Sequence, residues 1–231
     1  MEHLRHVAVV LFLAAIPLFL VTTNIRWVIA TPFLYSYGFD KYDITSRTDI
    51  ERSELLLAAN QIRDYFDNDV EDLDVKVVQR GVRRSLYNAR EVAHMRDVKQ
   101  LVGVVYRTQE IAALYLLTFV ALGLRFTGRK FLRGLGRYIG FGGIVTLGLV
   151  LIVGAGSLVG FDRLFLAFHM ISFDNDLWQL DPRRDYLLVM FPEDFFFDAT
   201  MWIAASTVVE ALVLSLPTLY FLWWRHDRTQ R

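Results

Sequence analysis

Long apolar tracts alternate with charged segments along this chain. Four tracts have the length and hydropathy of membrane spans: residues 6–29, 110–126, 138–159 and 199–224. About 20 apolar helical residues cross the roughly 30 Å hydrocarbon layer of a bilayer. No small-residue cleavage pattern follows the first tract, so we expect an uncleaved span rather than a signal peptide. The pattern predicts a membrane protein built on a four-helix transmembrane bundle.

The polar segment 30–109 has the periodicities of a small folded unit. Residues 73–77 alternate in polarity, and Gly81 can turn the chain, which predicts a short hairpin. Residues 90–107 have a helical pattern and lead into the second span. Within 52–66, apolar side chains recur at helical spacing: Leu55, Leu56, Ala59, Ile62 and Phe66. We therefore expect a small extracytoplasmic α+β cap over 30–109.

The basic residues indicate how the spans are oriented. The link 127–137 is basic and has no acid, and the tail 225–231 is also basic. Because Lys and Arg concentrate in cytoplasmic loops, we place both segments in the cytoplasm. Four spans then put the N-terminus inside as well, and they put 30–109 and 160–198 outside. We predict a multi-pass protein of the plasma membrane with both termini cytoplasmic and its reactive segments external.

Composition excludes several classes of function. The net charge is +0, which gives no general attraction to nucleic acid, so we expect no nucleic-acid partner. The chain has no cysteine, which excludes a thiol nucleophile, disulfides and cysteine-ligated metal sites.

Segment 160–198 carries the densest candidate chemistry. It mixes His169 with several carboxylates, aromatic side chains and two prolines, between two apolar tracts. Lipid-exposed irregular backbone is not tolerated in a bilayer, so we expect a structured segment at the membrane surface. Ionisable groups beside lipid indicate a site of reaction or binding.

Two of the five histidines, His94 and His169, fall in the external segments. Imidazoles transfer protons in both directions near neutral pH, so the pair can act as base and acid on one carbonyl; the alternative is two structural histidines. Asp97 shares a helix face with His94 and can orient its ring, unless that face is simply solvated. These groups with Asp181 can also form a metal site, but no metal-binding spacing is present and we predict none.

Polar and small residues within the spans have structural and functional interpretations. Asn24 and Arg26 lie at the outer end of the first span, where the arginine either reaches the surface or contacts a carbonyl or lipid headgroup. Glu210, near the middle of the fourth span, is expected to face the bundle and to be paired or protonated. Small residues in the third span favour close helix packing: Gly140, Gly142, Gly143, Gly148, Gly154 and Gly156.

Aromatic residues near the external turn can line an acyl-chain groove or anchor the chain at the interface. Trp178 and Tyr186 are the main candidates, and Asp181 with the following proline predicts a turn between them.

The chain resembles a family of bacterial integral membrane proteins, the lipoprotein intramolecular transacylases (Lit). The resemblance rests on YNAREVAHMRDVKQL at 87–101 and on residues 168–197, which begin FHMISFDNDLW. NIR at 24–26 and YSYGFDKYDI at 35–44 give weaker support. With four spans in matching order, it covers nearly the whole chain.

The resemblance implies a four-helix membrane bundle, a cap partly made of β structure, and His94 and His169 as the catalytic pair. It implies transfer of the sn-2 acyl chain of a diacylglyceryl-modified lipoprotein N-terminus to the α-amine of the same cysteine, without a cofactor. Membrane lipid is the second implied partner. Tyr37 and Asn175, within the matching motifs, are candidate substrate-binding residues. The alternatives are a membrane lipid hydrolase or acyltransferase, or a non-catalytic membrane module that binds lipid or lipoprotein.

Overall fold

The protein is described here from a computed structural model. It describes residues 2–229, and the side chains of all of these except 133 and 220–229. The chain divides into two compact units. A bundle unit comprises Met1–Arg26, Val105–Ala155 and Met201–Arg231, and a mixed unit comprises Trp27–Val104 and Gly156–Thr200.

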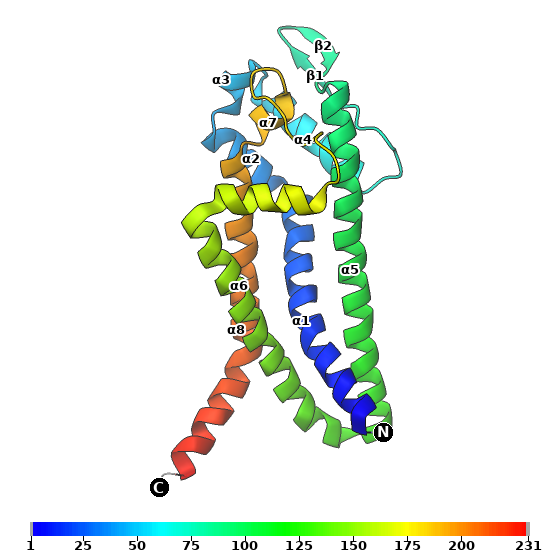
Figure 1. Ribbon diagram of the computed structural model, residues 1–231, viewed down its shortest axis with the longest axis vertical. Coiled ribbons are helices and arrows are strands. Elements are labelled where there is room, and N and C mark those ends of the chain that lie inside the picture. The colour runs from blue at the N-terminus through cyan, green and yellow to red at the C-terminus, as the bar shows by residue number, and fades with distance from the viewer. Residues whose placement is uncertain (1, 230–231) are drawn as a thin grey trace. The chain divides into compact units, whose positions relative to one another are not determined.

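Four long helices contribute to the bundle unit (Figure 1): α1 (Glu2–Ala30), α5 (Ala89–Thr127), α6 (Arg129–Ser172) and α8 (Glu193–Thr229). Each contains a stretch that is long and apolar enough to cross a membrane. Large apolar side chains such as Leu117 and Ile152 are 69% and 72% exposed, as lipid-facing residues must be. The predicted four-helix transmembrane bundle is therefore confirmed.

Aromatic and small residues pack the interior of the bundle unit. Phe12, Ile16 and Ala211 are buried there, and the Phe12 and Phe119 rings lie 4.4 Å apart. A Cβ added at Gly143 would lie 2.8 Å from the Ala211 carbonyl oxygen, so only glycine fits without a shift. The close packing predicted for the glycine-rich span is thus confirmed here.

The mixed unit contains the shorter elements: α2 (Pro32–Lys41), α3 (Ile44–Thr48), α4 (Arg52–Phe66), β1 (Lys76–Gln79), β2 (Val82–Ser85) and α7 (Tyr186–Met190). Helix α4 has the bounds predicted from its apolar spacing, and its buried face includes Leu55 and Ile62. The predicted hairpin is also confirmed. Strands β1 and β2 pair antiparallel, and the turn places Arg80 and Gly81 at φ 52° and 78°. The fold class of helical bundle plus small α+β unit therefore holds.

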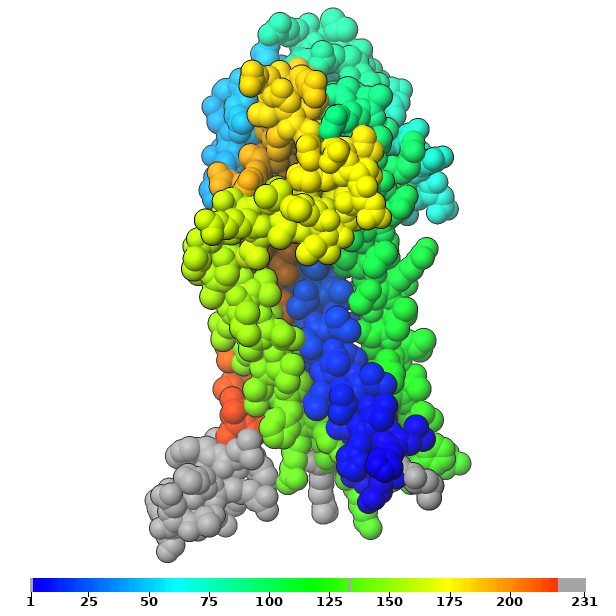
Figure 2. Space-filling view, viewed as in Figure 1, coloured from blue at the N-terminus to red at the C-terminus, as the bar shows by residue number. Residues whose placement is uncertain are grey.

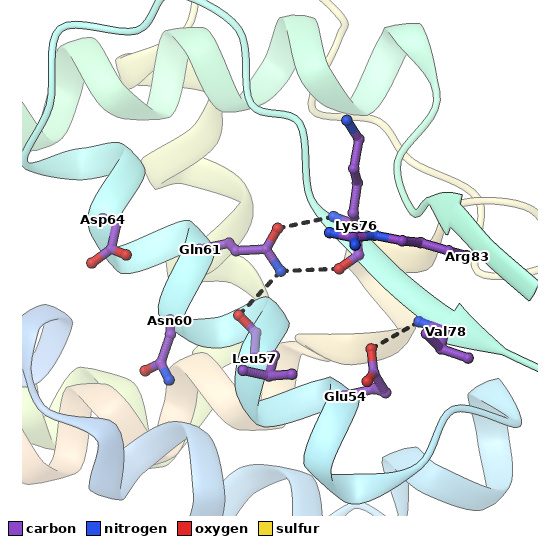
Figure 3. A pocket seen from close by; sticks show the side chains of 8 residues that line it. All are labelled: Glu54, Leu57, Asn60, Gln61, Asp64, Lys76, Val78 and Arg83. Carbon is purple, nitrogen blue, oxygen red and sulfur yellow. Dashed lines mark hydrogen bonds between the residues drawn. The ribbon is translucent and has the colours of Figure 1, made fainter.

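Side chains of α4 close the free edge of strand β1 (Figure 3). Gln61 accepts a hydrogen bond from the Lys76 backbone N–H and donates one to the Lys76 carbonyl, both over 3.0 Å. Glu54 accepts from the Val78 N–H over 2.8 Å. A hollow of about 400 Å³ lies beside this edge, lined by α4 and the hairpin. No predicted site residue is among its lining residues, so the candidate chemistry lies elsewhere.

Two segments differ from the expected organisation. The basic stretch 127–137 was expected as a link between spans, but it is helical except for Gly128. This single residue, with φ of 62°, separates the end of α5 from the start of α6. Glycine adopts this left-handed conformation without steric cost, so one residue suffices for the turn. The expected surface segment begins as a helix too, because α6 continues to Ser172 through a non-helical Gly160.

Candidate functional site

His94 lies in the first turns of α5, within the mixed unit and outside the expected span 110–126. Its side chain is 7% exposed, and its Nδ1 atom is buried without a hydrogen-bond partner. Burial lowers the pKa of His94 to about 4; the nearby His169 acts in the same direction and Asp97 acts against both. His94 is therefore a neutral imidazole at neutral pH.

His169 lies in the last turns of α6, also within the mixed unit. Its Nδ1 atom is 2.7 Å from the carbonyl oxygen of Phe165, one helical turn earlier. Because a carbonyl oxygen can only accept, Nδ1 must carry the proton. In the neutral ring the lone pair is then on Nε2, so this contact fixes His169 in the tautomer that presents a base.

The two imidazoles lie near each other in an aromatic surrounding. Their ring centroids are 6.4 Å apart and the planes are tilted by 31°. The Phe173 ring contacts both, at 5.2 Å from His94 and 5.7 Å from His169. Phe165 and Trp178 contact His169 at 4.4 and 5.1 Å. This separation is too large for a direct hydrogen bond between the rings.

Asp97 does not play the expected part of a ring-orienting carboxylate. Among the described residues it forms no hydrogen bond with His94; it accepts one from Asn175 Nδ2 over 2.9 Å. Its negative charge still acts on His94, against the effect of burial on the pKa. Asp97 therefore influences His94 through space and links α5 to the segment that follows α6.

Other predicted residues of the mixed unit have partners away from the histidines. Tyr186 accepts a hydrogen bond from Gln79 and stacks under the Arg84 guanidinium. Tyr37 stacks on Phe33 at 6.1 Å. Asp181 accepts a hydrogen bond from the Arg183 backbone N–H, as expected of a turn.

Asn24 and Arg26 belong to the bundle unit, where each has partners of its own. Asn24 is buried and its Nδ2 donates to Glu210 Oε2 over 2.8 Å and to Thr207 Oγ1 over 3.1 Å. The expected pairing of Glu210 is thus confirmed. Arg26 Nη1 donates to Gln109 Oε1 over 3.0 Å and pairs with Glu110 at 3.4 Å.

Three polar residues at the start of α5 and just before α7 were not predicted as site residues from the sequence. Glu91 and Asp185 are 0% and 1% exposed, and Asn88 joins them in one hydrogen-bond network. The N-x-x-E spacing at 88–91 is a helix-capping signature, so half of this network was detectable. In the part of the chain that the structure describes, no cluster of three or more His, Asp or Glu side chains has the arrangement of a metal site.

Four membrane-spanning helices and a histidine pair in a small mixed unit define an integral membrane protein with a candidate acid–base site. The sequence profile of the family described as "Lipoprotein intramolecular transacylase Lit" matches residues 10–196, and the chain belongs to this family. No curated protein matches the chain in sequence.

Solved structures with a similar fold come from Bacillus cereus. The lipoprotein intramolecular transacylase Lit of that organism is 19% identical, with a TM-score of 0.78, and the match covers 99% of this chain and 100% of that one. Two variants of it, with a histidine replaced by arginine or by alanine, match at 18% identity and TM-scores of 0.73. They cover 100% and 99% of this chain and 96% and 97% of theirs. At this identity the likeness supports the fold.

Proposed function

We propose that the protein moves the sn-2 acyl chain of a diacylglyceryl-modified lipoprotein to the α-amine of the same N-terminal cysteine. The ester C–O bond breaks, an amide C–N bond forms, and a lyso-form lipoprotein results. Family membership supports an intramolecular transacylase. The observation that carries the proposal is a tautomer-fixed His169 facing a neutral, buried His94 across 6.4 Å.

His169 is the general base of this proposal. An α-amine has a pKa of about 7.7–8.0, so a useful fraction is neutral near pH 7 and can attack the ester carbonyl. As the nitrogen attacks, it must lose a proton. The Nε2 lone pair of His169, exposed by the Nδ1–H bond to Phe165, accepts it.

The lowered pKa of His94 argues against a role as the general acid of the pair. An imidazole with a pKa of about 4 is rarely protonated at neutral pH, so it is a poor proton source. A neutral imidazole is nevertheless an effective hydrogen-bond donor to a developing oxyanion. We therefore assign His94 to the carbonyl oxygen, and His169 returns its proton to the departing glyceryl oxygen. His169 thus takes one proton from the amine and gives one proton to the leaving oxygen, so protons and charge balance.

The surroundings favour acyl transfer over hydrolysis. Amine and ester belong to one molecule, and correct positioning can supply about 7–11 kcal/mol of the barrier. Phe165, Phe173 and Trp178 surround the imidazoles with apolar rings, which limits the water that competes for the acyl group. Arg26 is less suited to the oxyanion, because Gln109 and Glu110 already engage its Nη1.

The location follows from the charge distribution. The basic segments 127–137 and 225–231 support cytoplasmic placement, which puts both histidines at the outer face of the membrane. We propose that lipid-anchored lipoproteins reach the site there.

The direct test is mass spectrometry of lipoprotein N-termini from cells with and without the protein. We expect an N-acylated, mono-O-acyl cysteine only when the protein is present. His169→Ala should abolish it, with a rate loss of about 10²-fold or more. Free fatty acid with an unmodified amine would instead identify a hydrolase, and an unchanged N-terminus would support a binding module.

A further inference from the structure

The segment 173–187, here the cover segment, lies along the first turns of α5. Figure 2 shows it, yellow to gold, on the surface next to the green start of α5. Its hydrogen bonds to α5 come from both sides of His94: Asn88 to Asp185, Arg90 to the Asp176 carbonyl, Leu187 N–H to Glu91, and Asn175 to Asp97. The segment is thus bonded to α5 on both sides of His94 along the chain, and its first residue, Phe173, contacts the His94 ring.

Asn88 and Glu91 cap the start of α5 and bind the cover segment at the same time. Asn88 Oδ1 accepts from the Arg90 and Glu91 backbone N–H groups, over 2.9 and 3.1 Å. Glu91 Oε2 accepts in return from the Asn88 N–H over 2.8 Å, which completes a capping box. The remaining polar atoms, Asn88 Nδ2 and Glu91 Oε1, contact Asp185 and Leu187 over 2.8 and 2.6 Å.

Burial of the two carboxylates makes these bonds hard to replace, although Asn88 itself lies exposed on the surface. All four carboxylate oxygens of Glu91 and Asp185 accept a hydrogen bond, the fourth from the Asp181 N–H over 2.7 Å. Arg184 Nε lies 3.6 Å from Asp185. A buried carboxylate oxygen that loses its donor is left unsatisfied, which costs free energy.

The cover segment carries two of the rings that contact the histidines. Phe173, at its start, contacts both imidazoles, and Trp178, in its middle, contacts His169. We propose that Asn88, Glu91 and Asp185 are positioning residues: they latch the cover segment over His94 and hold Phe173 and Trp178 against the pair. The catalytic part of this inference rests on the function proposed above, whereas the latch itself does not.

A charge-swap series tests the latch. Asn88→Asp keeps a good helix cap but turns an acceptor toward Asp185. Asp185→Asn leaves one acceptor oxygen for two donors, Asn88 Nδ2 and the Asp181 N–H. The double variant restores one donor and one acceptor with their places exchanged. Asn88→Ser keeps the cap and removes only the donor, without adding charge. Asn60→Asp, on the exposed part of α4, is the matched control.

The first measurement is the rate at which diethyl pyrocarbonate modifies His94 in the intact protein in detergent, followed by peptide mass spectrometry. Each single variant at 88 or 185 should raise this rate about tenfold, and the double variant should return it toward the wild-type rate. Asn60→Asp should leave it unchanged. Unaltered protection of His94 in the single variants overturns the latch.

The second measurement is transacylation of a synthetic diacylglyceryl lipopeptide. The single variants should lower kcat about tenfold with little change in KM, and the double variant should recover most of it. Loss of His94 protection with unchanged kcat overturns the positioning role. If the wild-type protein does not transacylate but the protection pattern follows the swap, the latch stands and the proposed reaction fails.

Discussion

His169 donates from Nδ1 to the carbonyl oxygen of Phe165 over 2.7 Å, within one turn of the same helix. The amide of an asparagine lies near the position of Nδ1, so His169→Asn can keep this bond while it removes the base. We expect activity to fall by about 10²-fold or more with little change in the melting temperature. Measured together, lipopeptide turnover and thermal unfolding separate the two effects. Substantial turnover by this variant would exclude His169 as the base.

The burial of His94 predicts a pH dependence of stability. Its pKa falls from 6.5 to about 4 on folding, so the unfolded chain binds the proton more readily. Its contribution to the free energy of unfolding is complete above pH 6.5 and is lost as the pH falls toward 4, by at most about 3 kcal/mol. Unfolding midpoints measured from pH 4 to 8 should show this loss, and His94→Gln should show a weaker one. Equal pH dependence in both proteins would contradict the burial of a neutral imidazole.

Trp178 should influence the balance between acyl transfer and hydrolysis. Its ring lies 5.1 Å from that of His169 and helps to exclude water. Trp178→Ala should raise the ratio of free fatty acid to N-acylated product about threefold to tenfold, whereas Trp178→Phe should stay near the wild-type ratio. Chromatography of the products from a labelled lipopeptide gives this ratio directly.

The contact of Asn24 with Glu210 should contribute to the stability of the bundle. Asn24→Leu removes the amide donor and leaves the carboxyl group without it, at a cost of about 1–3 kcal/mol. Glu210→Gln keeps an acceptor and should be much milder. Replacing both by leucine should recover much of the loss, because no polar group is then left unpaired. Thermal unfolding in detergent compares the three variants; a double variant as unstable as Asn24→Leu would argue against the pairing.

The glycines of α6 should differ in their tolerance of a methyl group. Gly143→Ala places Cβ 2.8 Å from the Ala211 carbonyl oxygen and should destabilise the protein by about 1–3 kcal/mol. Gly148→Ala is the control, since nothing lies within 4 Å of its Cβ position. Alanine has the higher helix propensity, so this control should be neutral or slightly stabilising. Similar melting temperatures for the two variants would count against close packing at Gly143.

Local patterns predicted the elements that depend on local interactions. The apolar spacing of 52–66 located α4, and alternation with Gly81 located the hairpin, because each pattern reports one buried face. Glycine content indicated close helix packing but not which glycines are in contact, since that depends on the neighbouring helix. The same limit applies to Gly143 and Gly148.

Contacts of the candidate site between residues far apart in the sequence could not be predicted from local patterns. The Asn88–Glu91 cap is a sequence signature, but its second partner, Asp185, is 97 residues away. The sequence predicted that Asp97 and His94 share one face of a helix. Only the fold reveals that the Asp97 carboxylate accepts a hydrogen bond from Asn175. The shift in the pKa of His94 likewise arises mainly from burial, which spacing along the chain does not report.

The contacts of Gln61 and Glu54 with the outer edge of β1 have a consequence for pairing with other chains. An unpaired strand edge presents free N–H and C=O groups that can pair with an extended segment of another chain. Here the side-chain amide of Gln61 takes the place of a backbone amide of a third strand. It bonds to both the N–H and the carbonyl of Lys76. This edge of the hairpin is thereby satisfied without a third strand, and the backbone groups of Lys76 and the N–H of Val78 are no longer free to pair with an extended segment of another chain.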